Sequence, residues 1–339
     1  MSLRITCGPW GETLTEQIEA AQAAEAAGFE AAWVAELHRS AFTQATAIAA
    51  RTERLGVGTA IAWTFSRSEM VTALSALDLD DLSDGRFVLG LGAGVKRLVE
   101  DWHNATFGKP AAHLRESVNL IRKFITESHT GARISFEGEW TRADVRGYER
   151  PFAPRRPEIP IYLAAVGPMM TRLTGEIADG WIAHELGSPR YVQEQILPNL
   201  AQGMRRAGRR PEDVTRVVSA CCVPYHDAAQ AKRWAAGLVA FYASVRTYTE
   251  FFAFHGFEAE ARAVQECFRN DDTAGMLEAV PDEMVDTFTA AGTPDEVRER
   301  IRQFEEVADV IKLTPPTHHV PSEVTHLAQE AIFEVFAAT

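Results

Sequence analysis

The sequence predicts a (β/α)8 barrel that forms a single domain over residues 1–339. Three observations predict this fold: eight short apolar runs, amphipathic stretches between them, and no linker or low-complexity tract. A strand, a helix and a second strand within a short span indicate a parallel pair joined by a crossover. An open doubly wound sheet shows the same alternation, but eight units with a closing helix favour the barrel.

The predicted strands are short runs rich in apolar and β-branched residues. They are Leu3–Cys7, Phe29–Ala35, Leu55–Ile61, Phe87–Leu91, Ile159–Ala164, Gly180–Ala183, Val214–Val223 and Val307–Leu313. Between the first two, apolar residues recur at three- and four-residue steps from Leu14 to Ala27, which predicts a helix that ends at Gly28. Further helices are predicted over Met70–Leu82, Gly167–Ala178 and Asp295–Glu305. The last has a strong start signal in Thr293-Pro294-Asp295-Glu296.

Two segments interrupt this alternation and are predicted as insertions after the fourth and seventh strands, over about residues 93–160 and 224–292. The first carries a predicted helix, His113–Ser128, and a hairpin-like run, Arg133–Tyr148. The second is mostly helical, and its stripe from Trp234 to Phe252 indicates core or a subunit contact more than a substrate wall. Barrels are typically about 250 residues long, and the insertions account for the excess. Both follow strands, so both belong at the C-terminal mouth, where active sites of this fold are built.

The overall charge narrows the classes of partner. A formal net charge of -13 and a pI near 5.3 disfavour binding to nucleic acids and to anionic membranes, so a small molecule is the expected partner. No apolar run is long enough for a membrane span and the start does not resemble a signal peptide, so we expect a cytoplasmic protein.

The remaining reactive residue types give no metal or nucleophile signal. The four cysteines lack CxxC spacing and are predicted to be free thiols. The pair His318-His319 lacks acidic or cysteine partners at ligand spacing, so no metal site is predicted. Lys96 and Lys312 lie nearest the predicted mouth without a neighbour that would depress their pKa, which makes a Schiff-base enzyme a distant alternative.

Five motifs occur in order along the chain: Ala24–Glu36, Gly58–Arg67, Ala76–Gly94, Ala164–Trp181 and Ala291–Pro294. Together they resemble the luciferase-like monooxygenase superfamily, most closely its branch that uses coenzyme F420, an 8-hydroxy-5-deazaflavin. The resemblance covers nearly the whole chain apart from the two insertions.

The resemblance implies a cofactor site on three strand ends. The third strand should end in a bulge with a non-prolyl cis peptide at Ala60-Ile61 that supports the middle ring, with contacts from Thr59, Ala60 and Ile61. Gly92, Ala93 and Gly94 let the backbone approach a ligand closely. The phosphate of the cofactor tail should lie at a helix start formed by Ala165, Val166, Gly167, Pro168 and Met169. From the residues alone, the same stretches also fit a plain core strand, a tight turn and a strand-to-helix turn.

Candidate catalytic and substrate residues lie near the same strand ends. Glu36 and His38 follow the second strand, and a histidine there could move a proton near neutral pH. Dehydrogenases of the family place the histidine directly after the acidic residue, and a glutamate where this chain has Val95, so the proton donor stays open. Candidate substrate contacts are Trp63, Trp102, His103 and Asn104, although the last three also fit a structured loop with its own small core.

Three functions therefore compete. The leading hypothesis is an oxidoreductase that transfers a hydride between coenzyme F420 and a small organic substrate. The runner-up is an FMN-dependent monooxygenase that uses oxygen and reduced flavin supplied by a separate reductase. The third is a flavin-binding barrel without turnover. The resemblance also implies a homodimer formed through barrel helices.

Overall fold

The computed structural model describes residues 3–338 and contains all eight predicted strands. The chain divides into two compact units. Unit 1 comprises residues 3–29, 183–195 and 217–338, and unit 2 comprises residues 30–182 and 196–216. Each unit contains parallel strands and the helices that connect them. The organisation as one domain stays a prediction.

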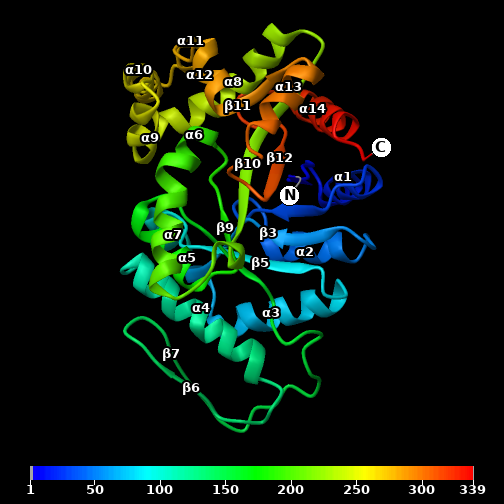
Figure 1. The fold of residues 1–339 in the computed structure, drawn as a ribbon, viewed down its shortest axis with the longest axis vertical. Coiled ribbons are helices and arrows are strands. Elements are labelled where there is room, and N and C mark those ends of the chain that lie inside the picture. Colours follow the sequence, from blue (N-terminus) through cyan, green and yellow to red (C-terminus); the bar gives the residue numbers. More distant parts are fainter. Residues whose placement is uncertain (1–2, 339) are drawn as a thin grey trace. The chain divides into compact units, whose positions relative to one another are not determined.

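Unit 2 contains a parallel sheet with the strand order β2-β3-β5-β8-β9. Figure 1 labels strands β3, β5 and β9 of this sheet and helices α2, α3, α4 and α5 of the same unit. The side chains of Phe87, Leu89 and Leu91 alternate along β5 and are fully buried, as expected for an inner strand. The elements of this unit are β2 (Ala31–Val34), α2 (Ala41–Ala49), β3 (Gly56–Thr59), β4 (Ala62–Trp63), η1 (Thr64–Ser66), α3 (Glu69–Leu82), β5 (Phe87–Gly92), η2 (Leu98–Trp102), α4 (Pro110–Glu127), β6 (Ile134–Glu137), β7 (Arg142–Val145), β8 (Ile161–Ala164), α5 (Pro168–Ile177), β9 (Gly180–Ile182), α7 (Leu197–Arg206) and η4 (Pro211–Asp213).

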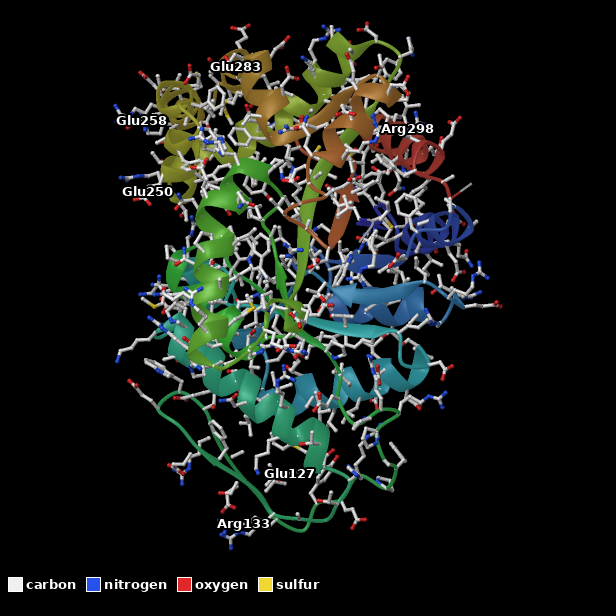
Figure 2. The ribbon with its side chains drawn as sticks, viewed as in Figure 1. Glu127, Arg133, Glu250, Glu258, Glu283 and Arg298 are labelled. Atoms are coloured by element: carbon white, nitrogen blue, oxygen red, sulfur yellow. The ribbon has the colours of Figure 1, made fainter. Side chains whose placement is uncertain are left out.

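The first insertion has the predicted helix and hairpin. The helix is α4, and β6 pairs antiparallel with β7. Figure 2 shows Glu127 at the end of α4 and Arg133 at the start of the hairpin. The carboxylate of Glu116 in α4 accepts hydrogen bonds from the N–H groups of Glu139, Trp140 and Thr141, which fixes the hairpin turn against the helix.

Unit 1 contains the strand order β11-β10-β12-β1, also parallel. Strand β11 was not predicted; it pairs with Cys221–Pro224 of β10. The elements are β1 (Arg4–Cys7), α1 (Leu14–Ala26), α6 (Pro189–Tyr191), η3 (Val192–Ile196), β10 (Thr215–Pro224), α8 (Ala228–Ser244), η5 (Arg246–Tyr248), α9 (Thr249–Phe254), α10 (Glu258–Arg269), α11 (Thr273–Glu278), α12 (Asp282–Phe288), β11 (Thr289–Gly292), α13 (Pro294–Arg302), β12 (Val310–Thr314) and α14 (Ser322–Val335).

The second insertion is helical but its apolar stripe is not continuous. Helix α8 ends at Ser244, and Val245 has an extended backbone with φ -92° and ψ 114°. Tyr248 therefore lies in the short turn η5 rather than on α8. The insertion packs around Phe252 and Phe288 in a core that includes Cys221 and Val223 of β10. Charged side chains such as Glu258 lie on its outer surface (Figure 2).

Other local predictions agree with the structure. The capping box of α13 forms between Thr293 and Glu296. Cys7, Cys221 and Cys222 are buried free thiols, and Cys267 is partly buried. None of the helices within residues 3–338 combines the length and the apolar character needed to span a membrane.

Candidate active site

Strand β3 is interrupted where the cofactor bulge was predicted. It pairs with β5 at Val57 and Gly58, ends at Thr59, and the chain rejoins β5 at Ala62–Trp63. The intervening Ala60-Ile61 peptide bond is cis. The prediction of a bulge with a non-prolyl cis peptide at this position is confirmed.

Thr59 ties the interrupted strand to β5 through its side chain. Its hydroxyl donates to the Gly90 carbonyl oxygen at 2.7 Å and accepts from the Gly90 N–H at 2.9 Å. A Cβ at position 90 would overlap the Thr59 carbonyl oxygen, so this contact requires glycine. Thr59 is fully buried and its hydroxyl proton is committed, so any cofactor contact would come from its backbone. That contact stays a prediction.

Glu36 holds the other side of the bulge from the end of β2. Its N–H donates to the Ile61 carbonyl oxygen at 3.0 Å, and its carboxylate accepts from the Trp63 N–H at 2.9 Å. Both carboxylate oxygens also bind the Arg67 guanidinium, and the Glu36 side chain is only 9% exposed. Such bidentate, charge-assisted pairs are among the strongest hydrogen bonds in proteins. These partners favour a positioning role for Glu36 over proton transfer.

The other candidate catalytic residue, His38, lies in the turn between β2 and α2 with an exposed side chain. The exposed imidazole of His38 is in contact with solvent. Its role in a reaction stays a prediction.

Two of the four candidate substrate residues contact each other. The rings of Trp63 and His103 meet edge to face with centroids 5.0 Å apart. Trp63 is buried directly after the bulge, whereas His103 is exposed. Trp102 precedes His103 at the end of η2 and is 60% exposed, and Asn104 follows with a left-handed φ of 49°. The exposed imidazole of His103 therefore lies beside Trp63, which directly follows the bulge.

The backbone is closely packed at Gly92, the last residue of β5, and left-handed at Gly94. A Cβ at Gly92 would overlap the end of the Ile61 side chain, and a Cβ at Gly94 would lie 3.4 Å from Val99. Gly94 also has a left-handed φ of 70°. The close approach at Gly92 thus involves Ile61 of the bulge. Cofactor contacts from Gly92, Ala93 and Gly94 stay predictions.

The start of α5 has the features of an anion site. Gly167 is its N-terminal cap, with φ -81° and ψ 157°, and no side chain caps the helix. The N–H groups of Met169 and Met170 are in the first turn, where an α-helix supplies no backbone acceptors. Pro168 is exposed, whereas Ala165 is buried and its carbonyl accepts from the Trp181 indole N–H at 2.8 Å.

Large apolar side chains are exposed after three strands of unit 2. They are Leu37 after β2, Val95 after β5, and Val166 and Met169 after β8, with exposed fractions of 52%, 61%, 39% and 66%. The carboxyl ends of parallel strands lie along the same edge of a sheet. Exposed apolar groups gathered in this way indicate a surface for a ligand or partner.

A second polar cluster lies in unit 1. The Nε2 atom of His184 is 2.7 Å from the Tyr248 hydroxyl, and the Leu186 N–H donates to His184 Nδ1 at 3.2 Å. Burial lowers the pKa of His184 to about 4, so the ring is neutral at pH 7. Tyr242 contacts the same ring edge to face, with centroids 4.4 Å apart.

Beside this pair, Lys312 of β12 forms an ion pair with Glu185, and the Thr314 hydroxyl donates to Glu185 at 3.4 Å. Burial opposes ionisation of Glu185, but the charge and hydrogen bond of Lys312 hold the pKa of Glu185 below its usual value. The structure thus gives Lys312 a carboxylate neighbour that the sequence did not reveal. An ammonium held in this way is not prepared as a nucleophile.

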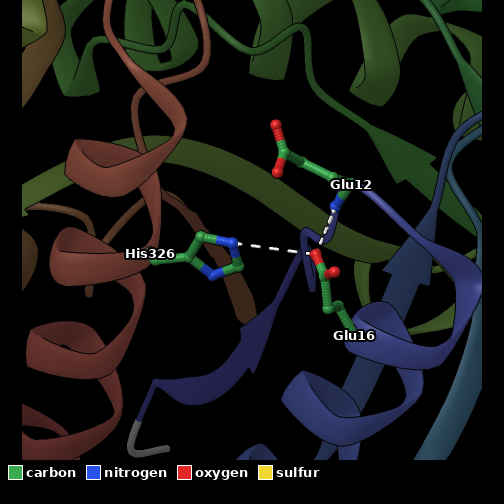
Figure 3. Close-up of side chains that lie close together, drawn as sticks. All are labelled: Glu12, Glu16 and His326. Carbon is green, nitrogen blue, oxygen red and sulfur yellow. Dashed lines mark hydrogen bonds and ion pairs between the residues drawn. The ribbon is translucent and has the colours of Figure 1, made fainter.

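Glu12, Glu16 and His326 form a third cluster, shown in Figure 3. Glu16 accepts the Glu12 N–H at 2.8 Å and lies 3.8 Å from His326 Nε2. Its own N–H donates to the Thr13 hydroxyl, so these bonds cap α1, and the His326 ring contacts Trp10. All three side chains are at least partly exposed. The contacts give the cluster a structural role, and the expectation of no bound metal stays a prediction.

Comparison with protein families matches residues 4–309 to the luciferase-like monooxygenase model. The chain belongs to the luciferase-like monooxygenase family. The predicted resemblance is therefore confirmed, and it covers most of the chain.

Two relatives of this luciferase-like protein are named for deazaflavin or pterin chemistry. A putative coenzyme F420-dependent oxidoreductase of Mycobacterium tuberculosis is 30% identical over 321 residues, which cover 90% of this chain and 92% of the relative. A 5,10-methylenetetrahydromethanopterin reductase of Archaeoglobus fulgidus is 30% identical over 288 residues, which cover 83% of each chain.

Solved structures support the fold of this luciferase-like protein. The coenzyme F420 dependent tetrahydromethanopterin reductase from Methanopyrus kandleri matches with a TM-score of 0.83 and 22% identity, covering 98% of this chain and 97% of the other. The oxygenating constituent of 3,6-diketocamphane monooxygenase from Pseudomonas putida, in complex with FMN, matches with a TM-score of 0.71 and 17% identity, covering 99% and 98%. The predicted (β/α)8-barrel class is confirmed.

Four polar residues of this luciferase-like chain were missed as site candidates. Arg67 lies within a quoted motif but received no role, and Tyr248 was assigned to the apolar stripe. His184 and Glu185 follow the apolar run Gly180–Ala183 directly. That is the signal that identified Glu36, so the pair was detectable.

Proposed function

We propose that this chain is an oxidoreductase that transfers a hydride between coenzyme F420 and a small organic substrate. The observation that carries the proposal is the interrupted strand β3 at Ala60-Ile61 in a chain that shares 30% identity, over 90% of its length, with a relative named as F420-dependent. The uncapped start of α5 belongs to the same unit.

The residues of unit 2 suit an anionic, tricyclic cofactor. The space around Gly167 is open, because a Cβ there would meet nothing within 4 Å. The free N–H groups of Met169 and Met170 favour a negative group, as helix starts do for phosphates. The exposed side chains of Val166 and Met169 would cover part of an apolar ring system.

When bound, F420 supplies the hydride donor or acceptor. In this proposal the backbone at Ala60-Ile61 supports its ring and Glu36 with Arg67 holds that backbone in place. His38 moves a proton between the site and solvent. Trp63 and His103 orient the substrate through aromatic and polar contacts.

An FMN-dependent monooxygenase is the second candidate. The structural match to an FMN complex, with a TM-score of 0.71, favours it. It requires oxygen and a reductase, whereas hydride transfer with F420 proceeds without oxygen. A flavin-binding protein without turnover is the third candidate, since Val95 stands where dehydrogenases of the family have a glutamate.

The test is an equilibrium titration of the purified chain with F420 and, separately, with FMN. We expect F420 to bind at least about tenfold more tightly. Tight binding of FMN with no binding of F420 would overturn the cofactor assignment. Turnover that occurs only in the presence of oxygen would favour the monooxygenase.

A matched pair of variants tests the start of α5. Gly167→Asp supplies a charged cap that competes for the free N–H groups, so we expect F420 to bind at least tenfold more weakly while the helix is unchanged or more stable. Gly167→Asn caps the helix without the charge and should bind F420 more tightly than Gly167→Asp. Equal affinities of both variants and the natural chain would exclude the phosphate from this position.

The expected homodimer, the separate reductase and the cytoplasmic location stay predictions. Light scattering of the purified protein would measure its mass in solution and so its number of subunits.

A further inference from the structure

The segment after β5 is anchored against Trp63. A Cβ at Gly94 would lie 3.4 Å from Val99 and 3.5 Å from the Trp63 ring, so these groups pack together. Val99 in η2 is fully buried, and its carbonyl oxygen accepts from the Ala105 N–H at 3.2 Å. These contacts hold η2 beside the residue that follows the bulge. All of these residues belong to unit 2, as does the bulge itself.

His103, directly after η2, contacts Trp63 through its ring. The two rings meet edge to face, with centroids 5.0 Å apart. Trp63 is itself fixed, because it is buried and its N–H donates to the Glu36 carboxylate at 2.9 Å. Among the residues that the structure describes, none forms a hydrogen bond with either ring nitrogen of His103, and this side chain is exposed. An imidazole carries at least one N–H whether it is neutral or protonated, so His103 has a donor available to a ligand.

The charged groups of η2 and the bulge occur in pairs that cancel. Each pair joins one cation to one carboxylate: Lys96–Glu100, Arg97–Asp101 and Arg67–Glu36. An anion would therefore lose hydration without gaining an uncompensated cation among these six groups. Leu37 and Val95, which follow β2 and β5 in the same unit, expose apolar side chains instead. These residues favour a ligand that is uncharged and has an apolar body.

We propose that His103 donates a hydrogen bond to the oxygen of an uncharged carbonyl substrate with an apolar body, and that Trp63 is the positioning residue that holds the imidazole. This rests on the proposed hydride transfer. Addition of hydride from reduced F420 to the carbonyl carbon breaks the C=O π bond and leaves its electron pair on oxygen, and a proton from solvent completes the alcohol. The N–H of His103 stabilises the charge that develops on that oxygen.

The experiment follows oxidation of reduced F420 by benzaldehyde, cyclohexanone and the anion 4-formylbenzoate, without oxygen. We expect kcat/KM of the natural chain to be at least about tenfold higher for benzaldehyde than for 4-formylbenzoate. His103→Phe keeps an aromatic ring on Trp63 and removes the donor. It should lower kcat/KM for the uncharged carbonyls about 10- to 100-fold, mainly through kcat, with F420 affinity unchanged within twofold.

Two further comparisons separate hydrogen bonding from packing. His103→Gln keeps an N–H donor and should recover part of the kcat that His103→Phe loses. Trp63→Leu should lower kcat in the natural chain but cause little further loss in a chain that already carries His103→Phe, because Trp63 acts through the imidazole. A purely structural role of Trp63 would give the same loss in both backgrounds and would remove Trp63 from the proposal.

The preference for an uncharged substrate is tested at Val95, whose side chain is 61% exposed beside Gly94. Val95→Lys adds an unpaired cation and should raise kcat/KM for 4-formylbenzoate relative to benzaldehyde at least about fivefold. Val95→Gln is the matched control, since it adds a polar side chain without charge. An equal rise of this ratio in both variants would contradict the charge argument.

Each outcome decides the question. Unchanged kcat/KM in His103→Phe would overturn the proposal, as would a natural chain that reduces 4-formylbenzoate as well as benzaldehyde. F420 binding without reduction of either uncharged carbonyl would also overturn it. Absence of F420 binding by the natural chain would instead be a failure of the proposed function, and the role of His103 would fall with it.

Discussion

Replacing Thr59 by valine should strongly destabilise the fold, because one hydroxyl satisfies two buried groups of Gly90. The change keeps the shape of the side chain and removes its donor and acceptor. A buried polar group left without a partner costs about 1–3 kcal/mol. The Gly90 N–H and carbonyl together therefore predict a loss of about 2–6 kcal/mol, a large share of a typical unfolding free energy of about 5–15 kcal/mol.

Urea denaturation measures this loss, with two matched controls. Thr59→Ser keeps the hydroxyl and removes one methyl group, so it should cost only about 1 kcal/mol. Thr46→Val makes the same chemical change at an exposed helical position, where the hydroxyl donates to the Phe42 carbonyl, and should cost less than about 1 kcal/mol. If Thr59→Val and Thr46→Val lower the unfolding free energy equally, Thr59 does not anchor the bulge.

Three further predictions concern ionisable side chains. Glu36→Gln should lower the unfolding free energy by about 1–2 kcal/mol, because it removes the charge paired with Arg67. If urea denaturation shows that the double variant Glu36→Gln, Arg67→Gln loses the sum of the two single losses, the two side chains do not interact. Asp80→Asn should cost about 2–4 kcal/mol, since the Asp80 side chain is 2% exposed and binds the Arg156 guanidinium through both oxygens; a thermal melt matching the natural chain would contradict this. Burial holds the pKa of His184 at about 4, below the ordinary 6.5, so the unfolded chain takes up a proton at this site first as the pH falls. The stability that comes from the neutral ring is therefore complete above about pH 6.5 and is lost as the pH falls to about 4, by at most about 3 kcal/mol. His184→Asn should flatten the pH dependence of the unfolding free energy between these two pH values.

Much of the fold was predictable because local periodicity encodes it. The eight strands and the capping box at Thr293 each depend on residue patterns within a short stretch of sequence. Strand β11 was missed because Thr289–Gly292 has no strand pattern of its own, and its pairing with β10 defines it. The break after Ser244 was missed because the apolar spacing continues across it. Helix α8 ends there, but buried residues before and after the break belong to the same hydrophobic core.

The site was predictable only in part, for a similar reason. The bulge at Ala60-Ile61 was identified from resemblance, not from the pattern of the strand. The partners of Glu36 and Lys312 lie 31 and 127 residues away in sequence, and no spacing rule reaches that far. Strand ends followed by polar residues identified positions such as Glu36, but only the structure shows which groups those side chains bind.

Hydrogen–deuterium exchange with and without F420 tests most directly whether the cofactor binds at the strand ends of unit 2. Saturating F420 should slow exchange of the backbone amides in residues 59–63, 92–94 and 166–170. Saturation that leaves these three segments unprotected, or protects only other parts of the chain, would contradict the assigned site.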